Sequence, residues 1–137
     1  MTAEEFLDTN VLLYACSSAP ADATKQSIAE QLILESNFAV SAQVMQEFIA
    51  NALRKKSLGI SESQIDASME LLGHVPVLPI SRELVLAAIG LRRRFQISHW
   101  DACILAAADN LRCSVLYSED LNHGQEYDGI RVLNPFQ

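Results

Sequence analysis

Four acidic residues could combine to bind divalent metal ions: Asp8, Glu47, Asp101 and Asp120. Mg²⁺ and Mn²⁺ prefer oxygen ligands, usually a few carboxylates completed by water and phosphate oxygens. Two such ions about 4 Å apart can supply the hydroxide and stabilise the leaving oxygen in phosphodiester hydrolysis. Carboxylates held close together repel and need a cation or a proton. No Lys or Arg adjoins residue 8, 101 or 120 in the sequence, which leaves a metal ion, or a basic side chain from elsewhere in the fold, as the counter-charge.

Asp8 and Asp120 each follow a short apolar segment that we predict to be a strand. Asp8 comes directly after Phe6 and Leu7, and two residues separate Asp120 from the segment 114–117. Open parallel sheets bind ligands outside the carboxyl ends of their strands. Each acid also has an ordinary interpretation, Asp8 as a helix N-cap and Asp120 as a turn residue.

Asp101 stands near the start of a predicted helix, at the head of an apolar stripe. The stripe continues through positions 104, 105 and 108, which are Ile, Leu and Ala. A carboxylate facing the core needs a partner or a metal ion, because burying a lone charge is costly. The alternative is a capping box, with Ser98 as the N-cap and Asp101 at the third helical position.

Glu47 lies on the helix predicted after Ser41, at the margin of its apolar face. It is beside Val44, and Asn51 follows one turn later. Taken alone, Glu47 is best interpreted as a solvated boundary acid. The metal-site hypothesis therefore depends on all four acids together.

The elements that must position these acids form a repeating strand–helix–helix order. We predict strands at 6–7, 38–40, 75–80, 114–117 and 130–133, a loop at 118–128, and helices at about 9–16, 23–35, 42–56, 62–72, 82–94 and 99–110. Asp22, Ser41, Ser81 and Ser98 are predicted helix caps, and residues 61–64 fit a capping box. Short apolar strands without alternation, placed between helices, indicate an α/β fold with a mostly parallel sheet covered on both faces.

Length and composition indicate a single domain over residues 1–137. Half of the residues are apolar, which argues against disorder, and no apolar run approaches the roughly 20 residues that span a bilayer. The first ten residues contain two acids and no basic segment, so we predict no signal peptide. The three cysteines have no CxxC spacing, which is typical of reduced thiols in a cytoplasmic protein.

The segments that carry the four acids resemble the motifs of PIN domains. They read FLDTNVLLY, SAQVMQEF, SHWDACILAAA and LYSEDLNHGQ, in the order of the family and spanning nearly the whole chain. The resemblance implies a three-layer α/β/α sandwich with a mostly parallel central sheet. It also implies an RNA-cleaving enzyme in which these four acids are catalytic and bind one or two Mg²⁺ or Mn²⁺ ions.

The resemblance is closest to VapC-type bacterial toxins, which implies a cognate antitoxin and a homodimer. By the same resemblance, four further residues support the site: Thr9, Asn10, Ser118 and Glu119. Thr9 and Asn10 would orient the acids, Thr9 by a hydrogen bond to a carboxylate. Ser118 would be a polar group behind the metal ligands. Glu119 could assist Asp120 or substitute for it.

The net charge of −7 argues against a broad basic nucleic-acid-binding face, but not against phosphate held through metal. Two basic clusters end predicted helices: Arg54, Lys55 and Lys56, and Arg92, Arg93 and Arg94. Helix-dipole compensation is their first interpretation, and RNA-backbone contact on either side of an acidic cleft is the alternative. We expect Trp100 to pack in the core or at an interface rather than to stack on a base.

Three other functions remain open at this point. The first is a PIN ribonuclease that is not a toxin, and the second is a non-catalytic PIN module that binds RNA or protein. The third is a phosphotransfer domain of the receiver or haloacid dehalogenase type, which also has Asp after its first strand. The dehalogenases need a second Asp two residues later, where this chain has Asn10, and no catalytic Lys follows a late strand.

Overall fold

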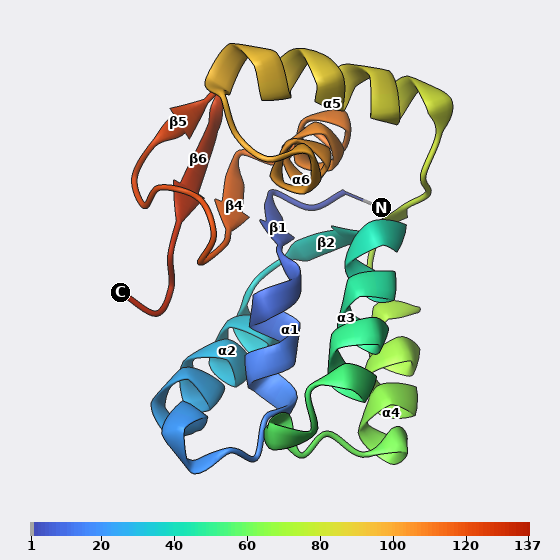
Figure 1. Ribbon diagram of the computed structural model, residues 1–137, viewed down its shortest axis with the longest axis vertical. Coiled ribbons are helices and arrows are strands. Elements are labelled where there is room, and N and C mark those ends of the chain that lie inside the picture. Colours follow the sequence, from blue (N-terminus) through green and yellow to red (C-terminus); the bar gives the residue numbers. More distant parts are fainter. Residues whose placement is uncertain (1) are drawn as a thin grey trace.

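The computed structural model describes residues 2–137 and contains an α/β fold (Figure 1). Its elements are β1 (Glu5–Leu7), α1 (Thr9–Cys16), the 3₁₀ helix η1 (Pro20–Asp22), α2 (Ala23–Glu35), β2 (Phe38–Ser41), α3 (Ala42–Arg54), the 3₁₀ helix η2 (Lys56–Leu58), α4 (Glu62–Leu72), β3 (Val77–Leu78), α5 (Arg82–Phe95), α6 (His99–Asn110), β4 (Val115–Tyr117), β5 (Glu126–Tyr127) and β6 (Ile130–Leu133).

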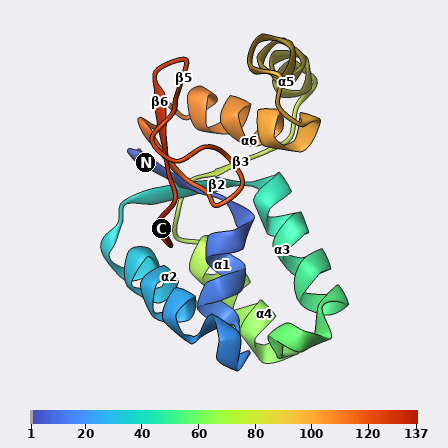
Figure 2. The same cartoon turned by 60° about the vertical axis from the view of Figure 1, so that its left-hand side comes forward.

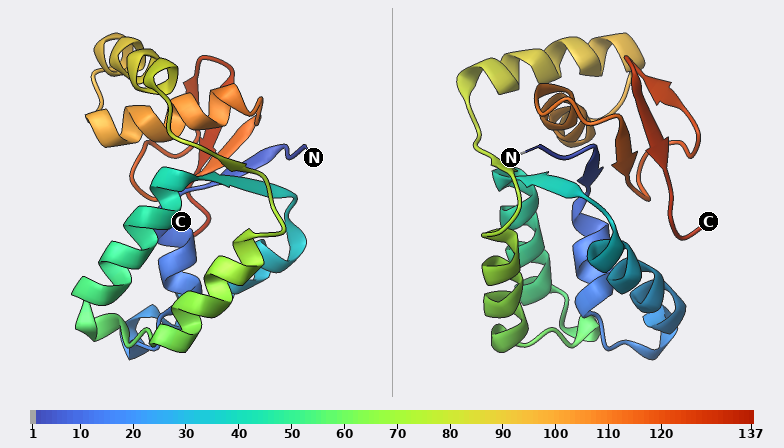
Figure 3. Two further views of the ribbon diagram at one scale, coloured as in Figure 1. Left: turned by 90° about the vertical axis from the view of Figure 1, so that its right-hand side faces the viewer. Right: turned by 180° about the vertical axis from the view of Figure 1, so that it is seen from behind.

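The sheet has six strands in the order β3-β2-β1-β4-β6-β5, with β1 near its centre. Phe6 of β1 pairs in parallel with Ala39 of β2 on one side and with Leu116 of β4 on the other. Only β5 and β6 are antiparallel. Helices α1 to α4 lie on one face of the sheet, and α5 and α6 lie on the other (Figures 1 and 3). The predicted α/β architecture with a mostly parallel sheet between helical layers is confirmed.

Strands β1 and β2 are short and buried on both faces, which explains why their residues do not alternate in polarity. Phe6 and Leu7 of β1 are fully buried, and all four residues of β2 are buried. Helix α6 lies between the sheet and α5 (Figure 2), and its residues 102–108 are all buried. A helix that is apolar on every side is enclosed by the protein. The core therefore fixes the ends of β1 and α6, next to Asp8 and Asp101.

Serine caps start most of the helices as predicted. The side chains of Ser41, Ser81 and Ser98 each accept a backbone N–H from the first turn of the following helix. Ser61 and Gln64 form both bonds of the capping box. Asp22 precedes α2 as predicted, but its side chain makes no cap bond.

Two features differ from the sequence prediction. The carboxylate of Asp22 accepts a hydrogen bond from the Ser17 hydroxyl at 2.8 Å, because the turn η1 holds it away from the start of α2. The predicted loop at 118–128 contains β5, which pairs with β6 across the turn at Asp128 and Gly129. Both turn residues have positive φ, the conformation that matches the twist of a two-residue hairpin.

Gly59 closes the connection between α3 and α4 next to Ser18. Its φ is +62°, in the left-handed region that favours glycine, and a Cβ atom there would also displace the Ser18 hydroxyl. Within residues 2–137, no helix has the length and apolar character needed to cross a membrane.

Candidate active site

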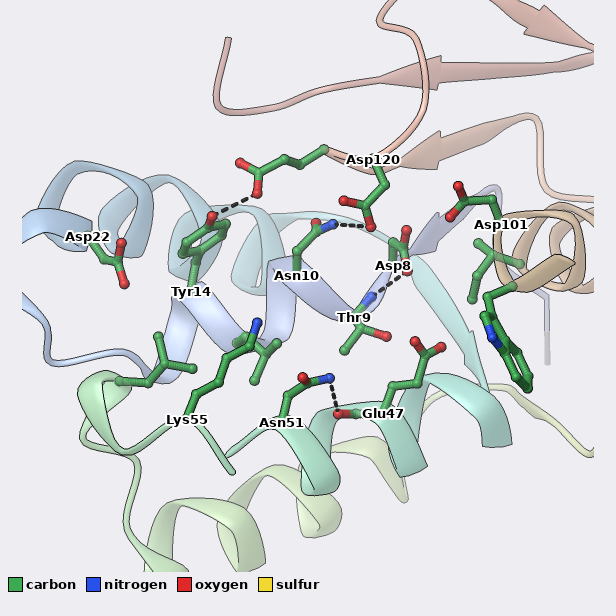
Figure 4. Close-up of a pocket in the computed structure, with 15 residues that line it drawn as sticks. Asp8, Thr9, Asn10, Tyr14, Asp22, Glu47, Asn51, Lys55, Asp101 and Asp120 are labelled. Atoms are coloured by element: carbon green, nitrogen blue, oxygen red, sulfur yellow. Dashed lines mark hydrogen bonds between the residues drawn. The ribbon is translucent and has the colours of Figure 1, made fainter. Parts of the chain in front are cut away.

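An acidic cavity of about 330 Å³ opens where the carboxyl ends of β1 and β4 meet α3 and the start of α6 (Figure 4). Six acids line it: Asp8, Asp22, Glu47, Asp101, Glu119 and Asp120. All four acids of the predicted metal site are among them. The structure therefore gathers at one cavity residues that are up to 112 positions apart, from 8 to 120.

Three of these acids form a tight group. One carboxylate oxygen from each of Asp8, Asp101 and Asp120 lies within 4.8 Å of the other two. Asp8 is buried, Asp101 is half-buried and Asp120 is exposed, so the group runs from the core to the surface. The three side chains come from the end of β1, the first turn of α6 and the segment after β4 (Figure 4).

Asp8 is the buried member of the group and is held by two hydrogen bonds. The backbone N–H of Thr9 donates to its Oδ1 at 2.7 Å, and the Ser118 hydroxyl donates to its Oδ2 at 2.7 Å. Burial, with smaller contributions from the charges of Asp120 and Glu47, raises the pKa of Asp8 to about 7 against these bonds. Asp8 is also the N-cap of α1, so its ordinary interpretation and its place in the acidic group hold together.

Asp120 is positioned by neighbours on both sides. Its backbone N–H donates to the Ser118 hydroxyl at 3.1 Å, and the Asn10 amide donates to its Oδ2 at 3.2 Å. Partial burial and the nearby charge of Asp101 raise the pKa of Asp120, while Lys55 acts in the opposite direction. Ser118 thus contacts both Asp8 and Asp120.

Asp101 faces the cavity from the start of α6 (Figure 4). Its backbone N–H donates to the Ser98 hydroxyl at 3.1 Å, which is the first half of the capping box considered above. The carboxylate is directed toward Asp8 and Asp120 rather than back to Ser98. Asp101 therefore starts the helix with its backbone while its side chain joins the acidic group.

Glu47 lines the same cavity but stands apart from the group of three. It projects from α3 on the opposite wall, and its Oε1 accepts a hydrogen bond from the Gln43 amide at 2.8 Å (Figure 4). Its negative charge still contributes to the raised pKa of Asp8. The structure thus places three of the four predicted ligands together and Glu47 across the cavity from them.

Thr9 and Glu119 differ in detail from the expected supporting roles. Thr9 supports Asp8 through its backbone N–H, whereas its hydroxyl is buried in the cavity wall without a hydrogen-bond partner. Glu119 accepts hydrogen bonds from the Tyr14 hydroxyl at 2.7 Å and from Lys25 at 2.8 Å. These two bonds hold the Glu119 carboxylate away from the group of three.

The PIN domain family model matches residues 6–125. This chain belongs to the PIN-domain family. A comparison with curated proteins gave no match. Solved structures with 20% identity or less match between 85% and 96% of the chain, and this likeness shows the shared fold.

Several solved structures are similar to this PIN domain. A toxin–antitoxin complex from Klebsiella pneumoniae has 20% identity and a TM-score of 0.70, covering 96% of this chain and 97% of the other. VapC20 from Mycobacterium tuberculosis, described as a sarcin-ricin loop cleaving toxin, has 18% identity and a TM-score of 0.68, with coverages of 85% and 89%. DNA-bound VapBC from Salmonella typhimurium has 18% identity and a TM-score of 0.67, with coverages of 96% and 97%.

Only one basic residue of the two predicted clusters lines the PIN-domain cavity. Lys55, directly after α3, faces it, whereas Arg54 and Lys56 do not line it. The cluster at 92–94 forms the last turn of α5 and does not line the cavity either. Arg94 pairs with Asp128 of the β5–β6 turn at 3.0 Å. The two clusters therefore do not flank the acidic site as a pair.

Several residues that position the acids could not be identified from local sequence patterns. Tyr14 and Lys25 hold Glu119, and their roles depend on contacts across about 100 positions of the chain. The contact between Gln43 and Glu47 could have been expected from their spacing, because residues four apart are neighbours on a helix. Trp100 is 65% exposed and lines the cavity, so the expectation of packing in the core is wrong, whereas packing at an interface stays a prediction.

The donor groups of this PIN domain fit a hard divalent cation. Three carboxylates converge, one of them buried, and Lys55 is the only cation among the cavity-lining residues within the part of the chain that the structure describes. The unpartnered Thr9 hydroxyl adds a buried polar atom beside them. No His or Cys joins this group of oxygen donors, which favours Mg²⁺ or Mn²⁺ over softer metals.

We expect Asp8→Asn to stabilise the metal-free protein, and to do so more at pH 8 than at pH 5. The pKa of Asp8 is raised from 3.8 to about 7, so the folded protein holds a proton that the unfolded chain releases. The free energy of unfolding of the wild type should therefore fall as the pH rises from about 4 to about 7. Urea unfolding in EDTA at several pH values measures both proteins. Identical pH profiles would contradict the raised pKa.

Proposed function

We propose that this PIN domain is a metal-dependent endoribonuclease that hydrolyses RNA phosphodiester bonds. The observation that carries the proposal is the convergence of Asp8, Asp101 and Asp120 within 4.8 Å, with no basic side chain matched to their combined charge. Such a group is stable when a divalent ion neutralises it. We assign the same three residues, with Glu47, as the metal ligands for one or two Mg²⁺ or Mn²⁺ ions.

When bound, the metal lowers the pKa of coordinated water and stabilises negative charge that develops on the phosphate. The chain itself supplies the positioning. Ser118 and the Thr9 N–H hold the two oxygens of Asp8, and Asn10 holds Asp120. Gln43 directs the carboxylate of Glu47 toward the same space.

Lys55 is the residue we propose for contact with the RNA backbone. Lys55 lines the same cavity as the acids, and its positive charge lowers the pKa of Asp120. Arg54 and Lys56 adjoin it and can add long-range attraction. Because these contacts are electrostatic, RNA binding should weaken as the salt concentration rises.

We further propose that the enzyme is the toxin of a toxin–antitoxin pair and acts in the cytoplasm as a homodimer, and that residues 1–137 form a single PIN domain. Support comes from the similar solved structures, two of which are toxin–antitoxin assemblies in which the similar chain is covered to 97%. The three free cysteines suit a reducing compartment. A PIN ribonuclease in RNA processing would have the same chemistry. A non-catalytic module is disfavoured, because it would not need the acidic group.

The decisive experiment sequences the RNA ends that appear when the wild-type protein is induced in cells, with Asp8→Asn as the control. New ends at defined positions, absent from the control, support an endoribonuclease. Growth arrest that a co-expressed neighbouring gene relieves supports the toxin. Ends without growth arrest favour RNA processing, and the absence of new ends would reject both.

Removing either of two metal ligands should abolish cleavage. Asp8→Asn and Asp101→Asn each replace a charged ligand by a nearly isosteric neutral one. We expect the rate of RNA cleavage to fall at least about 100-fold, the upper end of the loss seen when outer groups around a metal are changed. Asp109→Asn, an exposed change at the other end of α6, is the matched control and should keep full activity. Full activity in either ligand variant would remove that residue from the site.

Removal of divalent metal should stop turnover. EDTA is expected to abolish RNA cleavage, and Mg²⁺ or Mn²⁺ added in excess should restore it, because the acidic group is balanced only by the ion. The measurement is the initial cleavage rate of a fluorescent RNA before and after metal addition. Cleavage that persists in EDTA would point to acid–base catalysis without metal.

Ser118→Ala should weaken metal binding without unfolding the protein. The change removes the hydrogen bond to Asp8 and the acceptor for the Asp120 N–H, and such outer contacts typically affect affinity or activity by about 10- to 100-fold. The concentration of Mn²⁺ needed for half-maximal activity should rise accordingly. Ser114→Ala, an exposed change just before β4, serves as the control. Equal metal requirements in the two variants would contradict the role of Ser118.

A further inference from the structure

Trp100 occupies an unusual place for a tryptophan in this chain. It is the only tryptophan, it precedes Asp101 in α6, and its side chain is 65% exposed. A large aromatic side chain gains free energy from burial, so such exposure needs a reason. Trp100 lines the acidic cavity together with Asp101 and Glu47.

A row of polar side chains along α3 connects Trp100 to the rest of the cavity. Gln43, Glu47, Asn51 and Lys55 are four residues apart and therefore share one side of the helix. The Gln43 amide donates to Glu47 at 2.8 Å and to the backbone oxygen of Trp100 at 3.3 Å. One side chain thus fixes both the acid and the segment that presents the indole ring.

Three members of this row, Glu47, Asn51 and Lys55, line the cavity. From residue 47 to residue 55 the helical rise is about 12 Å, at 1.5 Å per residue. Figure 4 shows Lys55 at one end and Asp101, the neighbour of Trp100, at the other, with Asp8 and Asp120 between them. The cavity therefore offers an aromatic face at one end, acids in the middle and a cation at the opposite end.

We propose that Trp100 is a stacking platform for a nucleobase of single-stranded RNA, next to the phosphate that is cleaved. The inference deepens the proposed ribonuclease function and depends on it. Unpaired bases stack on exposed aromatic side chains, whereas bases in a duplex are already stacked on one another. In a cavity with six acids and one lysine, stacking supplies affinity that backbone contacts cannot. It also makes the enzyme selective for unpaired RNA.

A second apolar surface meets Trp100 from the other side. Ile80, Leu84 and Val85 line a groove there with it, and a protein partner is the competing occupant. Two observations favour RNA: Trp100 belongs to the wall of the acidic cavity, and its backbone is held by the same glutamine as Glu47.

Because Trp100 is the only tryptophan, its fluorescence reports directly on stacking. The probe is a mixed-sequence single-stranded RNA of about ten nucleotides, within the usual site size of such grooves. It is added with Mg²⁺ to the Asp8→Asn protein, which leaves it intact. We expect the emission to be quenched. An abasic chain of equal length and the same RNA in duplex form should quench much less.

Variants of Trp100 in the active protein supply a second measurement. Trp100→Ala should raise KM for the single-stranded RNA roughly 10- to 100-fold, while Trp100→Phe, which keeps an aromatic face, should stay near the wild type. Both changes are at an exposed side chain, and circular dichroism checks the fold. Size-exclusion chromatography should show the same oligomeric state for all three proteins.

The outcomes separate the inference from the function on which it depends. If the wild type cleaves RNA but the emission of the Asp8→Asn protein is unchanged, or Trp100→Ala keeps the wild-type KM, the stacking role is overturned and the ribonuclease stands. If Trp100→Ala changes only the oligomeric state, the apolar groove is a protein interface and the inference is wrong. If the wild type neither binds nor cleaves RNA, the proposed function fails and the inference fails with it.

Discussion

Electrostatic repulsion among three neighbouring carboxylates is the main constraint on the candidate site of this fold. Asp8, Asp101 and Asp120 lie within 4.8 Å of one another, and Asp8 is removed from solvent. Two helices begin at the site: Asp8 is the N-cap of α1, and Asp101 is in the first turn of α6. The positive ends of both helix dipoles therefore act on the acids, and the hydroxyl of Ser118 adds a donor. These groups reduce the repulsion, and a divalent ion would remove most of it.

The apolar core determines where the acids stand. The end of β1 is held between β2 and β4, and α6 is buried along residues 102–108. Neither element can shift without exposing apolar surface, so the backbone positions of Asp8 and Asp101 are fixed relative to each other. Lys25 and Tyr14 bind Glu119 at the rim, which keeps another negative charge from joining the group. The core thus keeps the acids close together, and the bonds to Glu119 limit the group to three carboxylates.

The distribution of charge also shapes how this PIN domain could recognise RNA. The chain carries a net charge of −7, and the cavity has one lysine among six acids. Phosphate contacts to basic residues, the usual source of affinity for nucleic acids, are therefore scarce at the site. Metal ions and contacts to the bases can take their place. The cluster at 92–94 stays with the β5–β6 turn through Arg94 and Asp128, away from this cavity.

Local patterns in the sequence determined the α/β architecture, the serine caps, and the placement of Asp8 and Asp120 after parallel strands. These features depend on residues within about four positions, where periodicity and capping act. Only the tertiary structure decided that Glu47 stands across the cavity from the other acids, that Glu119 binds Lys25, and that Trp100 is exposed. The Lys25–Glu119 bond joins residues 94 positions apart, and the Gln43–Trp100 bond joins residues 57 apart. Such contacts arise from how whole elements pack, which no short stretch of sequence specifies.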